Sequence, residues 1–485
     1  MVAEPNSRAS RRVDQRARTI VWLVVIASCI FLVFVIALVG RISVPLAAIC
    51  IMFLFFVTTV RYILRIDMVF GVLYIFVYVY TVFTQLAYVL FPDRLSIVSN
   101  GQYYGAQWFW PFYAFVFASF LGVFLLFVGL RSVHQTRSYF RLIDPGTRAW
   151  VGRVAFIVLI LIHNLIMIYY TASHFAQLSY RSQNVLKNNK IFFAGFAFYE
   201  YTIYTSYVNW KEYSTPGLGR SIAAAILAIS GLVFLTICVR AGQRIEIAAL
   251  CVGLFAYVLG EKNPRKSWQA YLGVALAGII AFVFMNAIRS ERGSQIDFRS
   301  LTHLLFAEPG KYANLTFEDI VFQDYCVPSL TLLTSMYYDR IDPVGTVKSL
   351  VANSLVLLNV PSLATRASRF IDPYGVRGYG YYAFTEGFEA MGLAGFVYNS
   401  VVMNLGIALW RPLLRTGNRS FTRYMTGVMA MSVFGLARGT SSAYVKAFYM
   451  WFVPCIVLFC LMSGTRPSLR PTTSTSDNTN ACAVT

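Results

Sequence analysis

Long apolar runs separated by short polar connections dominate the pattern along this chain. Most runs hold about 20 residues, which is the length a helix needs to cross roughly 30 Å of hydrocarbon. The runs do not alternate between apolar and polar residues with a period of two, as the strands of a membrane barrel would. Because backbone groups cannot remain unpaired in lipid, the runs are predicted to be helices. The chain is therefore predicted to be an all-α integral membrane protein.

The pattern predicts about 12 membrane-spanning helices. The first, Ile20 to Gly40, follows a basic stretch, but it is too long for a secretory signal and leads directly into the next apolar run. The others are Ile42 to Val60, Met68 to Phe91, Trp110 to Leu130, Val154 to Thr171, Ile191 to Asn209, Ser221 to Val239, Ile245 to Gly260, Trp268 to Ile288, Phe388 to Trp410, Tyr424 to Ala437 and Ala447 to Met462.

The distribution of basic residues predicts the orientation. Lys and Arg concentrate in short cytoplasmic loops. With the N-terminus inside, inner segments hold 23 of the 41 Lys and Arg residues and outer segments hold 18, of which nine lie in one long segment where the rule scarcely applies. The predicted regions are a basic cytoplasmic N-terminus (1–19), a nine-helix membrane region (20–288), an extracytoplasmic, partly helical segment (289–387), a three-helix membrane region (388–462) and a disordered cytoplasmic tail (463–485).

One apolar stretch inside the long outer segment, Val344 to Leu358, is a candidate for a further span. As a helix it would reach only about 22 Å, which is short for a bilayer. It also contains Lys348 and Asn353. We therefore predict an amphipathic or re-entrant helix here.

Three outward helix ends carry arginines on the side that the charge rule disfavours. Arg240 and Arg244 lie in "VRAGQRIE", Arg289 and Arg292 follow the ninth predicted helix, and Arg438 follows the eleventh. A guanidinium group pairs bidentately with phosphate or carboxylate oxygens. The pattern indicates a site for an anionic headgroup or a lipid diphosphate, although interfacial arginines also pair with lipid phosphates or with neighbouring glutamates.

A glycine-rich stretch, "DPYGVRGYGYYAFTEGFEAMGLAGFV", leads into the tenth predicted helix and places Glu386 and Glu389 at the predicted membrane boundary. A carboxylate facing a cavity can act as a general base on a sugar hydroxyl. The alternative is a salt-bridged glutamate at a glycine-rich helix entry. The four histidines and the cysteines show no metal-ligand spacing, so neither a metal nor another cofactor is predicted.

The run "GYYAFTEGFEAMGLAGFV" resembles the signature of bacterial oligosaccharide repeat-unit polymerases of the O-antigen polymerase (Wzy-like) family. "LARGTSSAYVKAFYMWFVPCIVLF" resembles the end of that family's penultimate helix, and "MNAIRSERG" is a third, weaker match. The resemblance covers the C-terminal 40% of the chain. It implies a multi-pass glycosyltransferase of the bacterial inner membrane, with both termini cytoplasmic, that joins polyprenyl-diphosphate-linked oligosaccharides into a surface polysaccharide at the outer leaflet.

The resemblance also implies roles for individual residues. Glu386 would be the general base, and Arg289 the second catalytic residue. The groups that would bind the substrate diphosphates are Arg240, Arg244, Arg292, Arg377, Arg438 and Lys446. The implied partners are the lipid-linked oligosaccharide, membrane lipid, and a chain-length regulator, flippase or export proteins, with no nucleic acid among them.

Two other functions fit parts of the sequence. A ligase that moves finished glycan to another acceptor would share the arginines and the long outer segment. A multi-helix secondary transporter would have two similar halves, and no convincing repeat is present. The best feature for transport is Glu200, since an intramembrane carboxylate is a functional candidate.

Overall fold

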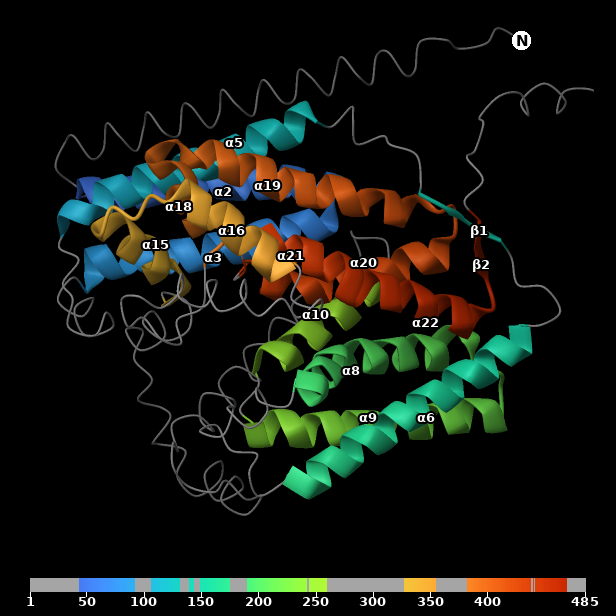
Figure 1. Ribbon diagram of the computed structural model, residues 1–485. Coiled ribbons are helices and arrows are strands. Elements are labelled where there is room, and N and C mark those ends of the chain that lie inside the picture. The colour runs from blue at the N-terminus through green and yellow to red at the C-terminus, as the bar shows by residue number, and fades with distance from the viewer. Residues whose placement is uncertain are drawn as a thin grey trace, which may run out of the picture. The chain divides into compact units, whose positions relative to one another are not determined.

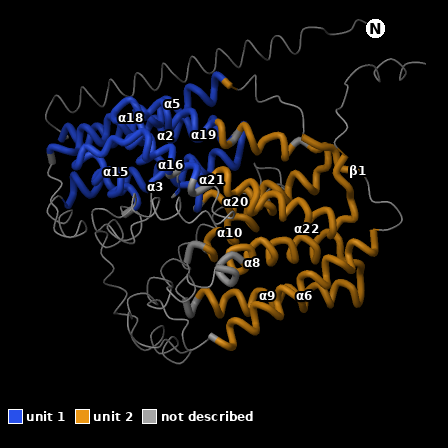
Figure 2. Tube along the Cα trace, viewed as in Figure 1, with its two compact units in different colours: residues 1–129, 315–404, 435–443 blue, residues 130–314, 405–434, 444–485 orange. Residues whose placement is uncertain are grey.

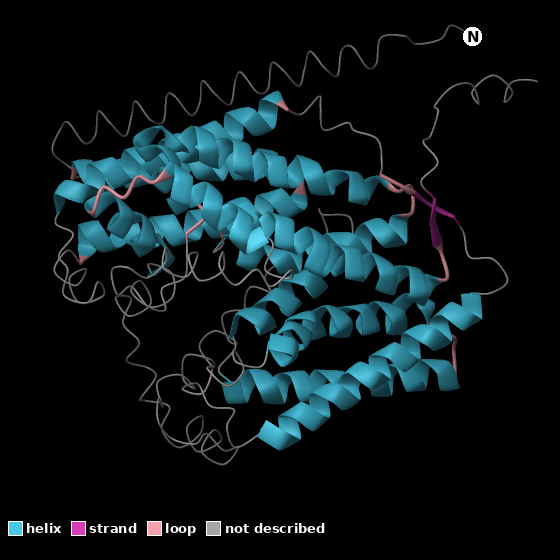
Figure 3. Cartoon of the chain, in the orientation of Figure 1, coloured by secondary structure: helices cyan, strands magenta, loops and turns pink. Residues whose placement is uncertain are grey.

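The computed structural model describes residues 43–91, 106–130, 139–143, 149–174, 190–241, 244–259, 327–354, 382–437, 439 and 441–468. These residues are almost entirely helical, and Figure 3 shows one small pair of strands beside the helices. The chain divides into two compact units, which Figure 2 distinguishes by colour. Each unit is described by itself.

Unit 1 comprises residues 1–129, 315–404 and 435–443. Its described elements, whose α-helices are labelled in Figure 1, are α2 (Val44–Ile66), α3 (Met68–Leu90), η2 (Ala106–Trp108), α5 (Phe109–Gly129), α15 (Val327–Tyr337), α16 (Pro343–Ser354), α18 (Thr385–Met391), η10 (Gly392–Ala394) and the first part of α19 (Gly395–Trp410). A single residue, Asp67, connects α2 to α3. Its carboxylate accepts a hydrogen bond from the Phe70 amide at 3.0 Å and so caps α3.

Unit 2 comprises residues 130–314, 405–434 and 444–485. Its described elements are β1 (Arg141–Ile143), α6 (Ala149–His174), α8 (Lys190–Val208), η6 (Asn209–Tyr213), α9 (Leu218–Ala241), α10 (Arg244–Leu259), η11 (Arg411–Arg415), most of α20 (Arg419–Ala437), η12 (Ala447–Phe452), α22 (Val453–Ser463) and β2 (Arg466–Ser468). The helix α21 (Ser441–Lys446) crosses from unit 1 to unit 2.

Both units have apolar interiors. In unit 2 a buried cluster gathers side chains from α6, α8 and α9, namely Met167, Phe196, Tyr199, Ile203, Phe234, Ile237 and Cys238. The two strands of unit 2 pair antiparallel, with Leu142 opposite Pro467. This pairing joins the segment before α6 to the segment after α22.

A half-buried ion pair lies between η6 and α20 in unit 2. Arg423 Nη1 lies 2.7 Å from Glu212 Oε1, and the same guanidinium group lies 4.4 Å from the centre of the Tyr257 ring. The segment η6 is a π-helix, a form that is rare and frequently found at functional sites. Burial, together with the neighbouring Glu212 carboxylate, raises the pKa of the Tyr213 hydroxyl to about 12.

The prediction of an all-α membrane protein is confirmed in its general form. Seven helical stretches in the described part of the chain are long and apolar enough to cross a membrane, and one of them, residues 385–414, contains a break at Gly392. The predicted helices Ile20 to Gly40 and Trp268 to Ile288 lie outside the described residues, so the count of about 12 stays a prediction.

The tenth predicted helix, Phe388 to Trp410, is not one continuous helix. It breaks at Gly392, whose φ of 59° is in the region that favours glycine. Asn399 on α19 donates to the Phe384 carbonyl at 3.3 Å, while Gly395 packs against Gly387. These two contacts show that α18 and α19 run antiparallel, with η10 as the turn between them.

Candidate functional site

The turn between α18 and α19 determines where Glu386 lies. A Cβ atom built on Gly387 would lie 2.5 Å from the Gly395 carbonyl oxygen, and one built on Gly395 would lie 2.8 Å from the Phe388 amide nitrogen. Both distances are shorter than side chains tolerate, so the backbones can approach this closely only because both residues are glycine. This close approach holds the first turn of α18, and Glu386 within it, against α19.

Glu386 is buried, with 3% of its surface exposed, and both of its carboxylate oxygens are hydrogen bonded. The Ser441 amide donates to Oε2 at 2.5 Å, and the Ser441 hydroxyl donates to Oε1 at 2.9 Å. The Tyr398 hydroxyl in turn donates to Ser441 Oγ at 3.3 Å. Because Ser441 is the first residue of α21, the carboxylate accepts from the amide at the start of that helix.

These contacts bring together two stretches that are 55 residues apart in the sequence. One is the glycine-rich stretch that contains Glu386, and the other is "LARGTSSAYVK". Arg438 lies three residues before Ser441, and Lys446 is the last residue of α21. The Arg438 side chain is outside the described residues. The structure therefore joins the two segments through Glu386 and Ser441.

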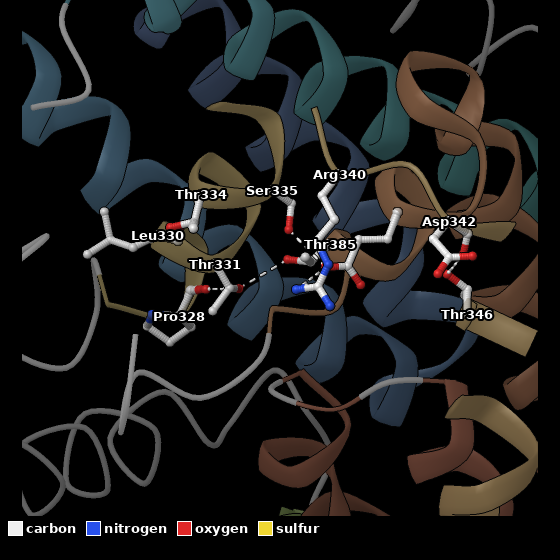
Figure 4. A network of polar contacts seen from close by, with 10 residues as sticks. Pro328, Leu330, Thr331, Thr334, Ser335, Arg340, Asp342, Thr346 and Thr385 are labelled. Carbon is white, nitrogen blue, oxygen red and sulfur yellow. Dashed lines mark hydrogen bonds and ion pairs between the residues drawn. The ribbon is translucent and has the colours of Figure 1, made fainter. Parts of the chain in front are cut away.

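Glu389, one turn further along α18, belongs to a different network, and Figure 4 labels its partners Ser335, Arg340 and Asp342. The Ser335 hydroxyl donates to Glu389 Oε1 at 2.9 Å, and Arg340 Nη1 lies 3.7 Å from the same oxygen. The Asp342 amide donates to the Glu389 main-chain carbonyl at 2.8 Å. Glu389 thus ties α18 to the end of α15 and the start of α16, which is the salt-bridged alternative considered for these glutamates.

The other predicted arginines are not brought together in the described part of the chain. Arg240 lies in the last turn of α9, and Arg244 is the first residue of α10. The side chains of both lie outside what the structure describes, as do Arg289, Arg292 and Arg377 altogether. Their convergence on one diphosphate site therefore stays a prediction.

Glu200 lies in the middle of α8, in unit 2, and 8% of its surface is exposed. Its Oε2 atom is buried and has no hydrogen-bond partner among the described residues. The neighbouring Tyr201 hydroxyl pairs with Ser432 Oγ at 3.1 Å. An unsatisfied buried carboxylate oxygen is costly, so Glu200 remains the feature that most favours the transport alternative.

Within the described ranges, no three His, Cys, Asp or Glu side chains gather as metal ligands would. Comparison with protein-family models, curated proteins and solved structures finds no match for this chain.

The sequence reasoning missed the partners of both glutamates. Ser441 and Tyr398 carry no motif of their own, and the only available signal for Ser441 was the hydroxyl-rich run "TSS" before an apolar helix, which is typical of a helix start. Arg340 and Ser335 lie about 50 residues before Glu389, and only the fold brings them together.

Proposed function

We propose that this chain polymerises polyprenyl-diphosphate-linked oligosaccharide repeat units into a surface polysaccharide at the outer leaflet of the bacterial inner membrane. The observation that carries the proposal is the contact between Glu386 and Ser441. It joins the two stretches on which the resemblance to repeat-unit polymerases chiefly rests, and it does so around a buried carboxylate.

The proposed reaction is a glycosyl transfer. A hydroxyl of the terminal sugar on one lipid-linked unit attacks the anomeric carbon of the chain held by another lipid diphosphate. A carbon–oxygen bond forms there, the bond to the diphosphate breaks, and the hydroxyl proton passes to Glu386. The predicted arginines stabilise the charge that develops on the departing diphosphate.

In this proposal Ser441 has two tasks. Its amide holds Oε2 of Glu386 and so fixes the carboxylate, while its hydroxyl occupies Oε1, the oxygen at which a sugar hydroxyl would donate. The acceptor sugar displaces the Ser441 hydroxyl from Oε1 before the proton is transferred. The Tyr398 hydroxyl donates to the serine oxygen and can keep doing so after the displacement.

Two contacts in unit 2 support the predicted topology with both termini in the cytoplasm. The β1–β2 pair joins the predicted inner segment before α6 to the C-terminal segment, which requires both to lie on one side of the membrane. The Arg423–Glu212 pair joins the start of α20 to the end of α8, and both of these ends are predicted to face inward.

Deletion of the gene, followed by analysis of lipid-linked and surface glycans, tests the function. A polymerase defect accumulates single repeat units on the lipid. Lipid-linked polymer would instead indicate a ligase, and unchanged glycans would favour transport and refute both transferase functions.

Two variants of α18 test the role of Glu386. The change Glu386→Gln keeps the shape of the side chain and removes the base, so polymer formation should fall about 100-fold or more. Glu389→Gln is the matched control, because it is a buried glutamate in the same helix with partners of its own, and it should keep activity in proportion to the protein present. Equal polymer from both variants would refute the base role of Glu386.

A further inference from the structure

The helix α5 provides a scale of depth for unit 1, because it is an apolar helix of 21 residues. Asn399 Nδ2 on α19 donates to Ser119 Oγ at 3.2 Å, and Asn404 Nδ2 donates to the Val123 carbonyl at 3.1 Å. Positions along α19 therefore increase in the same direction as positions along α5. The two helices run parallel.

The short helix α18 runs the opposite way along α5. The Phe384 ring, just before α18, lies 5.0 Å from Phe120, and the Phe388 ring lies 5.7 Å from Phe115. Phe120 is the twelfth residue of α5, so it lies about 16 Å from the end at Phe109. The helix α18 thus begins near the middle of the span and rises toward the Phe109 end.

The helix α15 begins at a similar depth. Ser329 Oγ donates at 2.8 Å to the carbonyl of Tyr80, the thirteenth of the 23 residues of α3. At the other end of α15, the Tyr337 ring lies 5.8 Å from Trp108, just before α5. The helix α15 therefore also rises from the middle of the long helices to the Phe109 end of α5.

Several hydroxyl groups at these depths find hydrogen-bond partners inside the protein, which lowers the cost of placing them in hydrocarbon. Hydroxyl groups of α15, of α18 and of the residues just before α18 pair with each other or with α3. These pairs are Thr84 with Ser329, Thr81 with Tyr382, and Thr331 with Thr385.

The helix α16 presents an apolar face on the outside of this group. It packs on α18, with Gly345 and Thr346 buried. On the other side Val344, Val347 and Val351 are exposed by 61%, 59% and 43%. Their spacing of three and four residues places them in one stripe along the helix. The exposed Lys348 lies at the edge of this stripe, where its long side chain can extend toward the membrane surface.

We propose that α15, α16 and α18 are inserted into the leaflet at the Phe109 end of α5, and that the valine stripe of α16 contacts lipid acyl chains. In the predicted topology this is the outer leaflet. The lipid contact continues onto α19, where Val397 and Val401 are each exposed by 48% on a helix that runs parallel to α5. The valines of α16 would otherwise be an apolar stripe in water.

The inference changes the expected position of Glu386. The sequence pattern placed it at the membrane boundary, whereas the depth of α18 places its carboxylate between the levels of Phe115 and Phe120. The inserted helices do not depend on the proposed reaction, because the contacts that locate them involve no substrate.

Site-directed spin labelling in lipid nanodiscs tests the proposal. Single labels replace Val347 on α16, Val401 on α19 as the lipid-facing reference, and Ile143 on β1 as the reference outside the spans, in a chain whose native cysteines have been replaced. The collision rate of each label is measured with oxygen, which concentrates in lipid, and with a nickel complex, which stays in water. At Val347, as at Val401, the label should collide mainly with oxygen. Nickel-dominated collision at Val347, as at Ile143, would overturn the proposal.

Low collision rates with both reagents at Val347 would also overturn the proposal, because a second copy of the chain or another protein would then cover the stripe.

A second measurement uses the protein with its native cysteines. Val347→Asp should shorten the half-life of the protein at elevated temperature in nanodiscs, because it places a charge in lipid. Ile143→Asp should leave the half-life unchanged, and equal half-lives for the two variants would contradict lipid contact.

Discussion

The contact between Gly387 and Gly395 allows a sharp test of how α18 is held. In the change Gly395→Ala, the new methyl group would lie 2.8 Å from the Phe388 amide nitrogen and would overlap the Gly387 carbonyl group. Contacts of a Cβ atom are ordinary from 3.4 Å, so the Phe388 nitrogen alone requires α18 to move away from α19 by about 0.6 Å, and the overlap with the Gly387 carbonyl group requires more. No side chain can absorb this movement, because both partners are backbone.

The expected cost follows from this rigidity. Overpacking a core typically costs about 1 to 3 kcal/mol, and a contact between two backbones should lie at the upper end of that range. The movement would also stretch the bond from Ser441 Oγ to Glu386, which is 2.9 Å long, toward lengths at which hydrogen bonds weaken. We therefore expect a loss of stability together with a loss of polymer of about 100-fold, the size expected for a 1 Å misplacement of a catalytic group.

The stability assay is the fraction of detergent-solubilised protein that remains monodisperse after heating, measured over a series of temperatures. The control is Gly435→Ala in α20, where a Cβ atom meets nothing within 4 Å. This change should be neutral or slightly stabilising, because alanine favours a helix over glycine by about 1 kcal/mol. If Gly395→Ala withstands heating as well as Gly435→Ala does, the close approach of α18 to α19 is not what holds Glu386 in place.

Three further predictions concern the hydrogen bonds and pairings described above. Ser441→Ala should lower polymer formation more than it lowers protein yield, while Ser441→Thr, which retains the hydroxyl, should restore part of the activity; equal activity of both would exclude a role for the hydroxyl. Reversing one charge in the Arg423–Glu212 pair should destabilise the protein by about 1.5 to 3 kcal/mol, and exchanging both charges should recover part of that loss in thermal unfolding. Cysteines at Arg141 and Ser468, which face each other in the β1–β2 register, should cross-link in isolated membranes and should not react with an impermeant thiol reagent in intact cells; failure to cross-link would contradict the strand pairing, and labelling in intact cells would contradict the predicted orientation.

Much of the fold followed from hydropathy because lipid imposes one rule on every span. An apolar run of about 20 residues must pair its backbone internally, and only a helix does so within one segment. The described helices α2, α3, α5, α6 and α9 accordingly lie within a few residues of the predicted runs. The two strands were not predicted, since three-residue segments such as Arg141–Ile143 carry no period long enough to detect.

The candidate site was predictable only as a set of residues. Glu386 was selected from its glycine-rich surroundings, and the structure confirms that those glycines permit a close backbone approach. Its partner could not be found in this way, because Ser441 lies 55 residues away and one serine in a hydroxyl-rich run looks like any other. Pairing of distant side chains depends on helix packing, which one sequence does not encode in a local pattern.

The tenth predicted helix shows why hydropathy averages can hide a re-entrant turn. A window over residues 385–414 is apolar enough to count as one span, yet it contains two antiparallel helices joined at Gly392. The mean hydropathy of a window does not depend on the direction in which the backbone runs. A glycine inside an apolar run therefore gives the same mean whether the helix continues or reverses at that residue. The reversal determines the depth of Glu386, because a continuous helix from the boundary would have placed it at the surface. A carboxylate held near the centre of the span instead requires hydrogen-bond donors from the protein, and Ser441 supplies two of them.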